Sequence, residues 1–420
     1  MKSSVPKIDQ LAGMNCYCTS FQGVGGLIKK QARGFQVYEI IDGTVLNNLS
    51  IVQDKFHKYP VYKLEKRDID SNHAILQIKK QFGIQLKVLG LKDSKANTEQ
   101  YASTEKTRNI RRKVRTNNLI LSLIGFSRTP LAKSSLLGNR FTIMIDDTEQ
   151  SELSVFESEV RNIGNFYGLQ RFGSERAVSH LAGREILKKN FRSAVELLLS
   201  YTTDYDSKMS REIREKCRDP QNYAQVLEMI PPGMDIEYQM MSAMVRGKDA
   251  IAALREIPIS IRRLFIHAYQ AYIFNKCLST ALLDGEDLLR GREDDLCFEI
   301  EGPIKFGKIR KFDSAVDSES DVVPAVRLVG YSFQPGNGRF ELLTKNLLQN
   351  EGLTARDFYI KEMEELSSQG GFRQAPLCCR DLNFINRSPL TISFKLPKGS
   401  YATTLLRELM KPGDPIRAGF

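Results

Sequence analysis

The 420-residue sequence lacks the usual signatures of a metalloprotein or a disulfide-rich protein. Its seven cysteines are scattered, and none of them forms a C-x-x-C pair. The four histidines do not cluster either; they are His57, His73, His180 and His267. Zinc sites need thiols or imidazoles at short spacings, and disulfide frameworks are typical of small secreted domains. We therefore expect no metal site and reduced, structural thiols.

Long apolar runs and nucleotide-binding loops are also missing. No stretch approaches the roughly 18 uncharged apolar residues of a membrane helix. The opening residues, MKSSVPKIDQLAGMNCYC, carry no apolar core of a secretory signal. The sequence has no convincing G-x-G-x-x-G or Walker-type loop, so no nucleotide cofactor is predicted. These absences lead us to expect a cytoplasmic protein without membrane contact.

Acidic residues are outnumbered, which gives the chain a net charge of +11. Such an excess favours polyanionic partners, and nucleic acid is the first candidate. The densest basic stretch is KTRNIRRKVR, residues 106–115, which contains no acid. Within it, Arg108, Arg111 and Arg112 are candidate RNA contacts, although a solvated basic face gives the same pattern.

Hydrophobic periodicity predicts an α+β protein. Strands are expected at 34–41, 61–66, 84–90, 140–145 and 390–396. Helices are expected at 70–83, 152–164, 260–278 and 354–368, and also after Gly399. The region 174–276 has a helical pattern, while 284–337 suggests short strands and loops. The last strand and helix cannot form a domain alone, so we expect them to pack on the N-terminal sheet.

One stretch raises a chemical question. In VLGLKDSKANTEQ an apolar run ends, and Asp93 then lies between Lys92 and Lys95. A nearby cation keeps a desolvated carboxylate ionised, which suits a nucleophile or a base. An ordinary surface turn has the same composition, so this stretch alone does not decide.

Six stretches, including the one around Asp93, resemble motifs of a known family. They are GVGGLIKKQARGFQVYE (23–39), GLKDSKANTEQ (90–100), LLGNRF (136–141), NFYGLQRFG (165–173), HAYQAYIFN (267–275) and LPKGSYATTLLREL (396–409). In this order they resemble the TruD family of tRNA pseudouridine synthases. The resemblance covers nearly the whole chain.

The resemblance implies roles for individual residues. Asp93 falls where the family carries its essential aspartate. Lys29 falls at the basic residue that pairs with that aspartate, although the adjacent Lys30 leaves the register open by one. Phe141, in GNRF, falls at a position that forms a wall of the pocket.

The segment NFYG implies two more site residues. Asn165 falls at an active-site asparagine, and Tyr167 at an aromatic residue that stacks on the target base. The family usually has Asn-Tyr-Phe-Gly, so the two rings are exchanged here. From the residues alone, Asn165 also fits a helix end, and Tyr167 also fits a core position. Lys92, Arg171 and Arg407 are further candidate RNA contacts, and the two arginines fit salt bridges equally well.

The resemblance also implies a fold and a reaction. The expected fold is a pseudouridine synthase catalytic domain, residues 1–173 and 377–420, with a mixed, largely antiparallel sheet flanked by helices. A mostly helical TRUD domain, residues 174–376, is inserted in it. The expected substrate is uridine 13 of tRNA, with no metal and no cofactor. A non-catalytic RNA-binding protein and a cofactor-dependent RNA methyltransferase are the alternatives.

Overall fold

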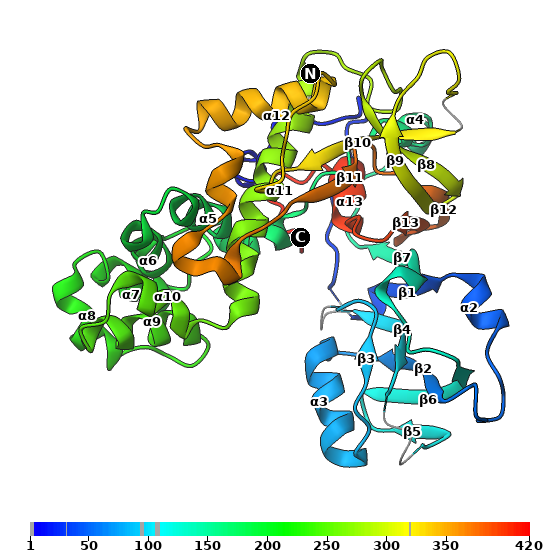
Figure 1. Cartoon of the computed structure of the whole chain (residues 1–420), viewed down its shortest axis with the longest axis horizontal. Helices are drawn as coiled ribbons and strands as arrows, with labels where there is room; N and C mark the ends of the chain where they lie inside the picture. The colour runs from blue at the N-terminus through cyan, green and yellow to red at the C-terminus, as the bar shows by residue number, and fades with distance from the viewer. Residues whose placement is uncertain (1–3, 31, 93–95, 106–109, 319–320) are drawn as a thin grey trace.

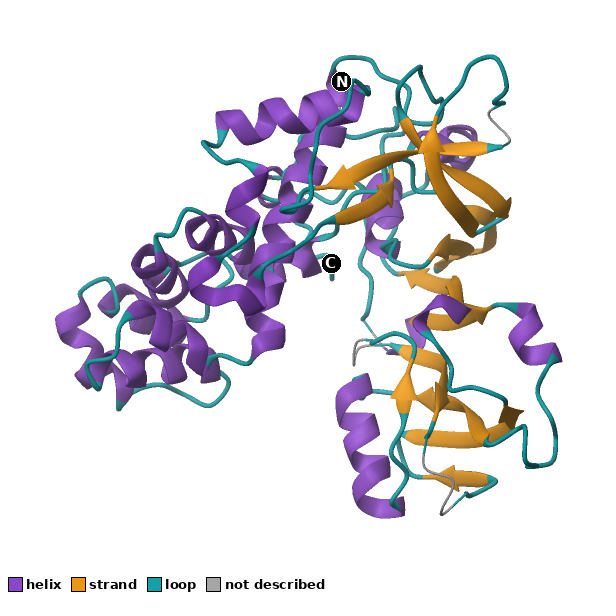
Figure 2. Cartoon of the chain, viewed as in Figure 1, coloured by secondary structure: helices purple, strands orange, loops and turns teal. Residues whose placement is uncertain are grey.

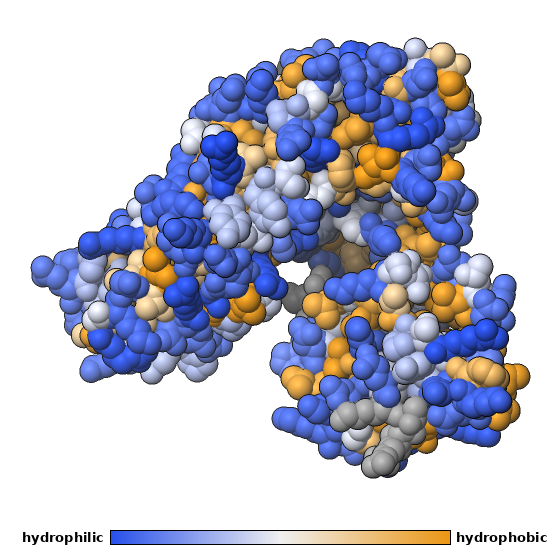
Figure 3. Space-filling model, viewed as in Figure 1, coloured by the Kyte–Doolittle hydropathy of each residue, from blue (hydrophilic) through white to orange (hydrophobic). Residues whose placement is uncertain are grey.

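The computed structural model describes residues 4–30, 32–92, 96–105, 110–318 and 321–420. The chain forms two arms that join at one end (Figure 1). One arm consists of helices and the other is built around strands (Figure 2). The space-filling view shows an open hollow between the two arms (Figure 3).

The strand-rich arm contains a nine-stranded mixed sheet. Its strands are β1 (Phe35–Ile41), β2 (Tyr59–Lys66), β3 (Lys87–Val88), β4 (Asn97–Ser103), β5 (Lys113–Arg115), β6 (Leu119–Ser127), β7 (Leu136–Ile145), β12 (Arg380–Arg387) and β13 (Leu390–Pro397). Their order is β12-β13-β7-β1-β4-β2-β6-β5, with β3 beside β4. Among the described strand pairs of this sheet, only β1 and β4 run parallel.

Helix α3 (Ser71–Phe82) covers one part of this sheet. The Asp70 carboxylate accepts hydrogen bonds from two backbone N–H groups of the first turn, and Gly83 ends the helix in the left-handed region at φ 69°. Ala74 and Ile78 are buried against β2, β4 and β6. The cap and the apolar spacing place this helix as the sequence predicts.

The C-terminal strand and helix join the N-terminal sheet, as the sequence also predicts. Strand β13 pairs with β7, and its alternating residues Ile392, Phe394 and Leu396 are all buried. Helix α13 (Ala402–Met410) packs in the same hydrophobic core as α4 (Leu153–Glu159). The two ends of the chain therefore build one sheet together.

The helical arm contains α5 (Ser179–Leu187), α6 (Phe191–Ser200), α7 (Lys208–Lys216), α8 (Tyr223–Leu227), α9 (Asp235–Val245) and α10 (Ala250–Glu256). The 25-residue helix α11 (Ile259–Leu283) links this arm to the rest of the molecule. Its first half packs in the core of the arm, and Phe274 and Leu278 of its second half pack in a separate core. Within the described residues, no helix combines the length and apolar character needed to cross a membrane.

A smaller sheet follows α11 in the chain. It consists of β8 (Leu296–Gly302), β9 (Lys305–Lys311), β10 (Val322–Leu328) and β11 (Gly371–Gln374), in the order β11-β10-β8-β9. Helix α12 (Arg339–Asn350) packs near it, and two short helices, α1 (Lys7–Leu11) and α2 (Gly43–Asn47), complete the set. The predicted domain bounds at 173–174 and 376–377 stay a prediction.

Two sequence-based expectations need correction. The α-helix expected at 354–368 is instead two 3-10 turns, Ala355–Phe358 and Lys361–Leu366, and Met363 leaves helical geometry with a φ of −144°. Arg262 of α11 binds the Glu365 carboxylate at 2.5 Å, which ties this segment to α11. The strand expected at 84–90 forms pairs only at Lys87–Val88.

Candidate active site

A pocket of about 250 Å³ lies where β1, β4, β7 and the start of α13 meet. Its walls are formed by Lys29, Phe35, Val37, Leu91, Lys92, Ala96, Thr98, Asn139, Phe141, Gln170, Ser400, Tyr401, Ala402 and Thr403. The fold thus brings together Lys29, Lys92 and Phe141, three predicted site residues from separate parts of the chain.

Phe141 forms an apolar wall of this pocket. In the sheet register it lies between Val37 of β1 and Phe394 of β13. Its ring stacks on Phe394 with 5.3 Å between ring centroids and meets the Phe35 ring edge-on at 6.4 Å. The Phe141 ring is therefore packed against an aromatic ring on each side.

Lys29 reaches the pocket because the preceding glycines allow a close backbone approach. A Cβ atom at Gly26, which has φ 90°, would lie 2.6 Å from the Asp146 carbonyl oxygen. Leu27 and Asp146 exchange two backbone hydrogen bonds of 2.9 Å at this point. Lys29 has a φ of 60°, uncommon for a side-chain-bearing residue, and its Nζ lies 5.2 Å from the Phe35 ring centroid.

The neighbouring lysine points elsewhere. Lys30 Nζ binds the Asp147 carboxylate at 2.9 Å, and both side chains are more than half exposed. Of the two lysines that the sequence left open, Lys29 is therefore the one that lines the pocket.

Asp93 and Arg108 lie outside the described residues. The residues on either side of positions 93–95 are described, and Leu91, Lys92 and Ala96 all line the pocket. The chain therefore reaches the pocket before position 93 and leaves from the pocket after position 95.

Lys92, a predicted RNA contact, forms an ion pair with a buried carboxylate. Its Nζ binds Glu39 Oε1 at 2.9 Å, and the Glu39 side chain is 0% exposed. The other carboxylate oxygen of Glu39 accepts a hydrogen bond from the Tyr101 backbone N–H at 2.8 Å. The Lys92 charge therefore neutralises a buried carboxylate, and the RNA contact expected at Lys92 stays a prediction.

The backbone that leads to position 93 is tightly held. The Lys92 N–H donates to Ser71 Oγ at 2.9 Å, and the Lys92 carbonyl accepts from the Ser71 N–H at 3.2 Å. Gln100 Nε2 donates to the Gly90 carbonyl at 2.6 Å. A Cβ at Gly90 would lie 3.1 Å from Lys92 Nζ and 3.3 Å from Glu39 Oε1, so the glycine leaves room for the ion pair.

Asn165 lies beside the pocket without lining it. It is 1% exposed, and its Oδ1 accepts a hydrogen bond from Arg373 Nη2 at 2.8 Å. The Asn165 Nδ2 donates to the Gln374 carbonyl at 3.2 Å, while Arg373 Nε donates to the Asn165 backbone carbonyl at 2.9 Å. Asn165 therefore positions a buried arginine on β11.

Arg373 organises the aromatic residues next to the pocket. Its guanidinium lies 4.1 Å from the Tyr167 ring centroid and donates to the Gly399 carbonyl at 2.6 Å. The Tyr167 and Tyr401 rings meet edge-to-face at 5.9 Å. Of these two rings, Tyr401 lines the pocket. Burial lowers the pKa of Arg373, which still remains a cation because free arginine titrates so high.

The remaining predicted arginines separate into three environments. Arg171 is half-buried and donates from Nε to the Tyr401 hydroxyl at 3.2 Å, near the pocket. Arg111 and Arg112 are exposed beside β5. Arg407 is 3% exposed and binds Asp9 at 2.6 Å and Glu408 at 3.2 Å. Of the two interpretations for Arg407, the salt bridge is confirmed, and the RNA contact stays a prediction.

Three residues at this site are not predicted from the sequence. Tyr401 lies within the stretch KGSYATT, so its motif was recognised without the residue being singled out. Glu39 ends the stretch GVGGLIKKQARGFQVYE without standing out there, and Arg373 lies in a stretch with no chemical signature. Their importance depends on the partners that the fold brings to them.

Comparison with known proteins shows the family of the chain. Residues 11–409 match the family model described as tRNA pseudouridine synthase D (TruD). The chain belongs to the TruD family. It is 32% identical to a probable tRNA pseudouridine synthase D of Pyrobaculum neutrophilum, with 99% of both chains covered. It is 28% identical to the protein of the same description from Methanococcoides burtonii, also with 99% of both covered.

A solved structure supports the same TruD assignment. The crystal structure of the putative tRNA pseudouridine synthase D from Methanosarcina mazei superposes with a TM-score of 0.78 at 27% sequence identity. The match covers 98% of this chain and 99% of that one. The predicted resemblance and the predicted α+β fold with a mixed sheet are therefore confirmed.

Proposed function

We propose that this TruD protein converts a uridine of tRNA to pseudouridine, with Asp93 as the catalytic carboxylate. The match of residues 11–409 to the TruD family carries the proposal. Uridine 13 is the target that the family resemblance implies. The pocket beside β1 and β4 would receive the uridine.

The proposed reaction is an isomerisation. The bond between ribose C1′ and uracil N1 breaks, the base turns, and a bond forms between C1′ and C5. One proton leaves C5 and one is gained at N1. Nothing is oxidised and no water is consumed overall, so the chemistry needs neither a metal nor a redox or nucleotide cofactor.

Asp93 would act in its ionised form. A carboxylate can attack C1′, attack the base, or remove a proton from the sugar, and each role requires a negative charge. We propose that Lys29 supplies the cation that keeps this charge at neutral pH. The proposal that Lys29 acts on Asp93 is supported by the lining of one pocket, which includes Lys29, Leu91 and Ala96.

The target base must leave its stack to reach the pocket, which costs a few kcal/mol. Stacking on an aromatic ring offsets part of this cost. The resemblance implies this role for Tyr167, and Tyr401 and Phe141 provide further aromatic surface at the pocket. The net charge of +11 and the hollow between the arms (Figure 3) support binding of the surrounding RNA there.

A release assay tests the proposal. The protein is incubated, without added cofactor, with tRNA that carries tritium at uracil C5. Isomerisation releases the label because the C5 proton is lost. A protein that only binds RNA releases none, and a methyltransferase acting through C5 releases none without a methyl donor. Absence of release from an RNA-binding preparation would contradict the proposal.

The two adjacent lysines provide a matched pair of variants. Lys29→Met is expected to lower kcat at least 100-fold, because the carboxylate loses its neighbouring cation. Lys30→Met removes the same charge one residue away, at an exposed pair with Asp147, and kcat should stay within about twofold. Equal effects of the two substitutions on kcat would exclude a specific role for Lys29.

A further inference from the structure

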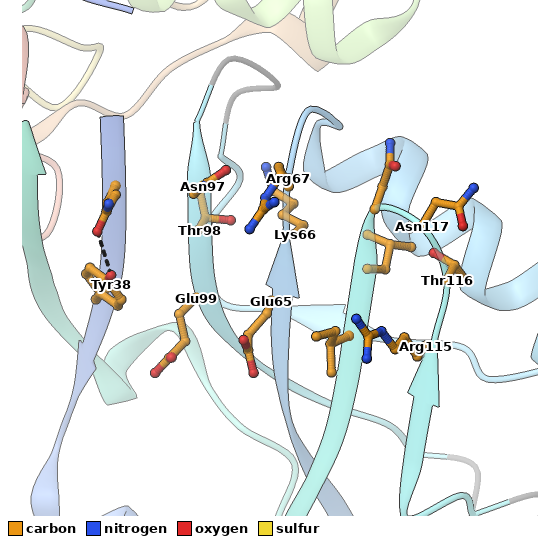
Figure 4. Close-up of a pocket in the computed structure, with 14 residues that line it drawn as sticks. Tyr38, Glu65, Lys66, Arg67, Asn97, Thr98, Glu99, Arg115, Thr116 and Asn117 are labelled. Atoms are coloured by element: carbon orange, nitrogen blue, oxygen red, sulfur yellow. Dashed lines mark hydrogen bonds between the residues drawn. The ribbon is translucent and has the colours of Figure 1, made fainter. Parts of the chain in front are cut away.

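Figure 4 shows a second pocket, of about 330 Å³, at the same sheet. It is formed by the ends of β1, β2 and β4 and by the turn between β5 and β6. Side chains alternate between the faces of a strand. Val37 therefore faces the first pocket, while its neighbours Gln36 and Tyr38 face the second.

The second pocket is lined mainly by groups that form hydrogen bonds. Asn97, Asn117 and Gln36 provide side-chain amides, which both donate and accept. Asn97 Oδ1 and Thr116 Oγ1 are buried and have no hydrogen-bond partner in the described part of the chain. Because buried polar atoms are nearly always paired, these two atoms call for a partner from outside the protein.

The charges at this pocket suit an anionic ligand at one end. Figure 4 shows Arg67 and Asn97 on neighbouring strands at the same end of the pocket. Arg67 and Arg115 are exposed and form no ion pair with the residues that the structure describes. At the other end Lys63 is shared by Glu99 at 3.1 Å and Glu65 at 3.9 Å, so the acidic groups of the pocket are gathered away from Arg67.

The position of the pocket connects it to the proposed active site. Ala96 lines the first pocket, Asn97 lines the second, and Thr98 lines both. Consecutive residues at the start of β4 therefore reach both sites. The two pockets therefore share the start of one strand, although they open on opposite faces of the sheet.

We propose that the second pocket binds one nucleotide of the substrate RNA close to the target uridine. The base would be held by the amides of Asn97 and Asn117, since amides pair with the hydrogen-bonding edges of unstacked bases. The phosphate would lie at Arg67. This inference depends on the proposed function only for the identity of the RNA.

Pairing protein variants with RNA variants tests this directly. A set of tRNA transcripts carries a single abasic site at each position near the target in turn, and dissociation constants are measured by filter binding. Asn97→Leu and Arg67→Ala should each weaken binding of unmodified tRNA about tenfold. Arg161→Ala, which removes an exposed arginine outside both pockets, should change binding less than twofold.

The decisive readout is non-additivity. One abasic position should weaken binding by the wild type about tenfold and have little further effect on Asn97→Leu. Additive effects at every position, or wild-type affinity for both pocket variants, would overturn the proposal. Arg67 is exposed, so its variant remains informative if Asn97→Leu fails to fold.

This outcome is independent of the isomerase assay. Non-additive losses of tRNA affinity without tritium release would support the nucleotide pocket and contradict the proposed reaction. Tritium release with additive effects throughout would sustain the reaction and remove the pocket.

Discussion

At the scale of single residues, the pair formed by Glu39 and Lys92 explains the segment that leads to position 93. A carboxylate that is 0% exposed needs a partner, and Lys92 Nζ provides it at 2.9 Å. Gly90 leaves the space for this pair, and Ser71 and Gln100 hold the backbone around it. The glycine and the lysine of GLKD are therefore explained by packing and charge.

Removing one member of this pair should be costly. Lys92→Met leaves Glu39 buried and unpaired, so we expect a loss of about 3 kcal/mol in the free energy of unfolding. The double variant Glu39→Gln with Lys92→Met buries no charge, and its loss should be about 1 kcal/mol. Urea unfolding followed by circular dichroism measures both. A double variant that loses as much free energy of unfolding as Lys92→Met alone, or more, would refute the coupling.

At the scale of elements, the contact between α5 and α11 contains a buried histidine. His180 of α5 is 2% exposed, and its ring stacks on Tyr272 of α11 at 5.0 Å. Burial lowers the pKa of His180 to about 4, and the nearby Arg184 adds to this shift. The imidazole is therefore neutral in the folded protein at physiological pH.

This histidine should make stability depend on pH. In the unfolded chain its pKa is about 6.5, so between pH 6.5 and pH 4 the unfolded state binds a proton that the folded state does not. Stability should therefore fall as the pH drops through this range, by about 3 kcal/mol in total. His180→Phe should remove that part of the pH dependence. The free energy of unfolding is measured for the wild type and the variant from pH 7 to pH 4. An equal loss in both proteins over this range would contradict this account.

The elements that the sequence predicts well are those with local signals. Helix α3 has its cap and its apolar spacing, and β13 alternates apolar and polar residues. Strand β4 was missed because its buried face includes Thr98 and Gln100, which are polar. Gln100 is buried because it holds the Gly90 carbonyl, a contact that no local pattern reveals.

The candidate site was predicted only in part for the same reason. The motifs indicated Lys29 and Phe141, and both line the pocket. For Arg407 the sequence left a salt bridge and an RNA contact equally open, because its ion-pair partner Asp9 lies almost 400 positions away in the chain. Glu39 and Arg373 were missed because a charge becomes informative only when its burial is known.

At the scale of the whole molecule, two arms enclose a hollow and the chain carries a charge of +11 (Figure 3). Binding of tRNA should therefore depend steeply on salt, because each phosphate contact releases counterions. About 6 such contacts would lower affinity ~1,000-fold between ~50 and ~200 mM salt. Arg111→Ala should reduce the salt slope by about 1 if this exposed residue contacts a phosphate. A flat salt response would exclude the basic surface as the RNA footprint.

The proposed chemistry depends most directly on the carboxylate at position 93. Tritium release from C5-labelled tRNA, measured for the wild type and for Asp93→Ala together with tRNA affinity, tests it in one experiment. We expect release to fall below detection in the variant while the dissociation constant for tRNA stays within a few fold. Undiminished tritium release by Asp93→Ala would contradict the account.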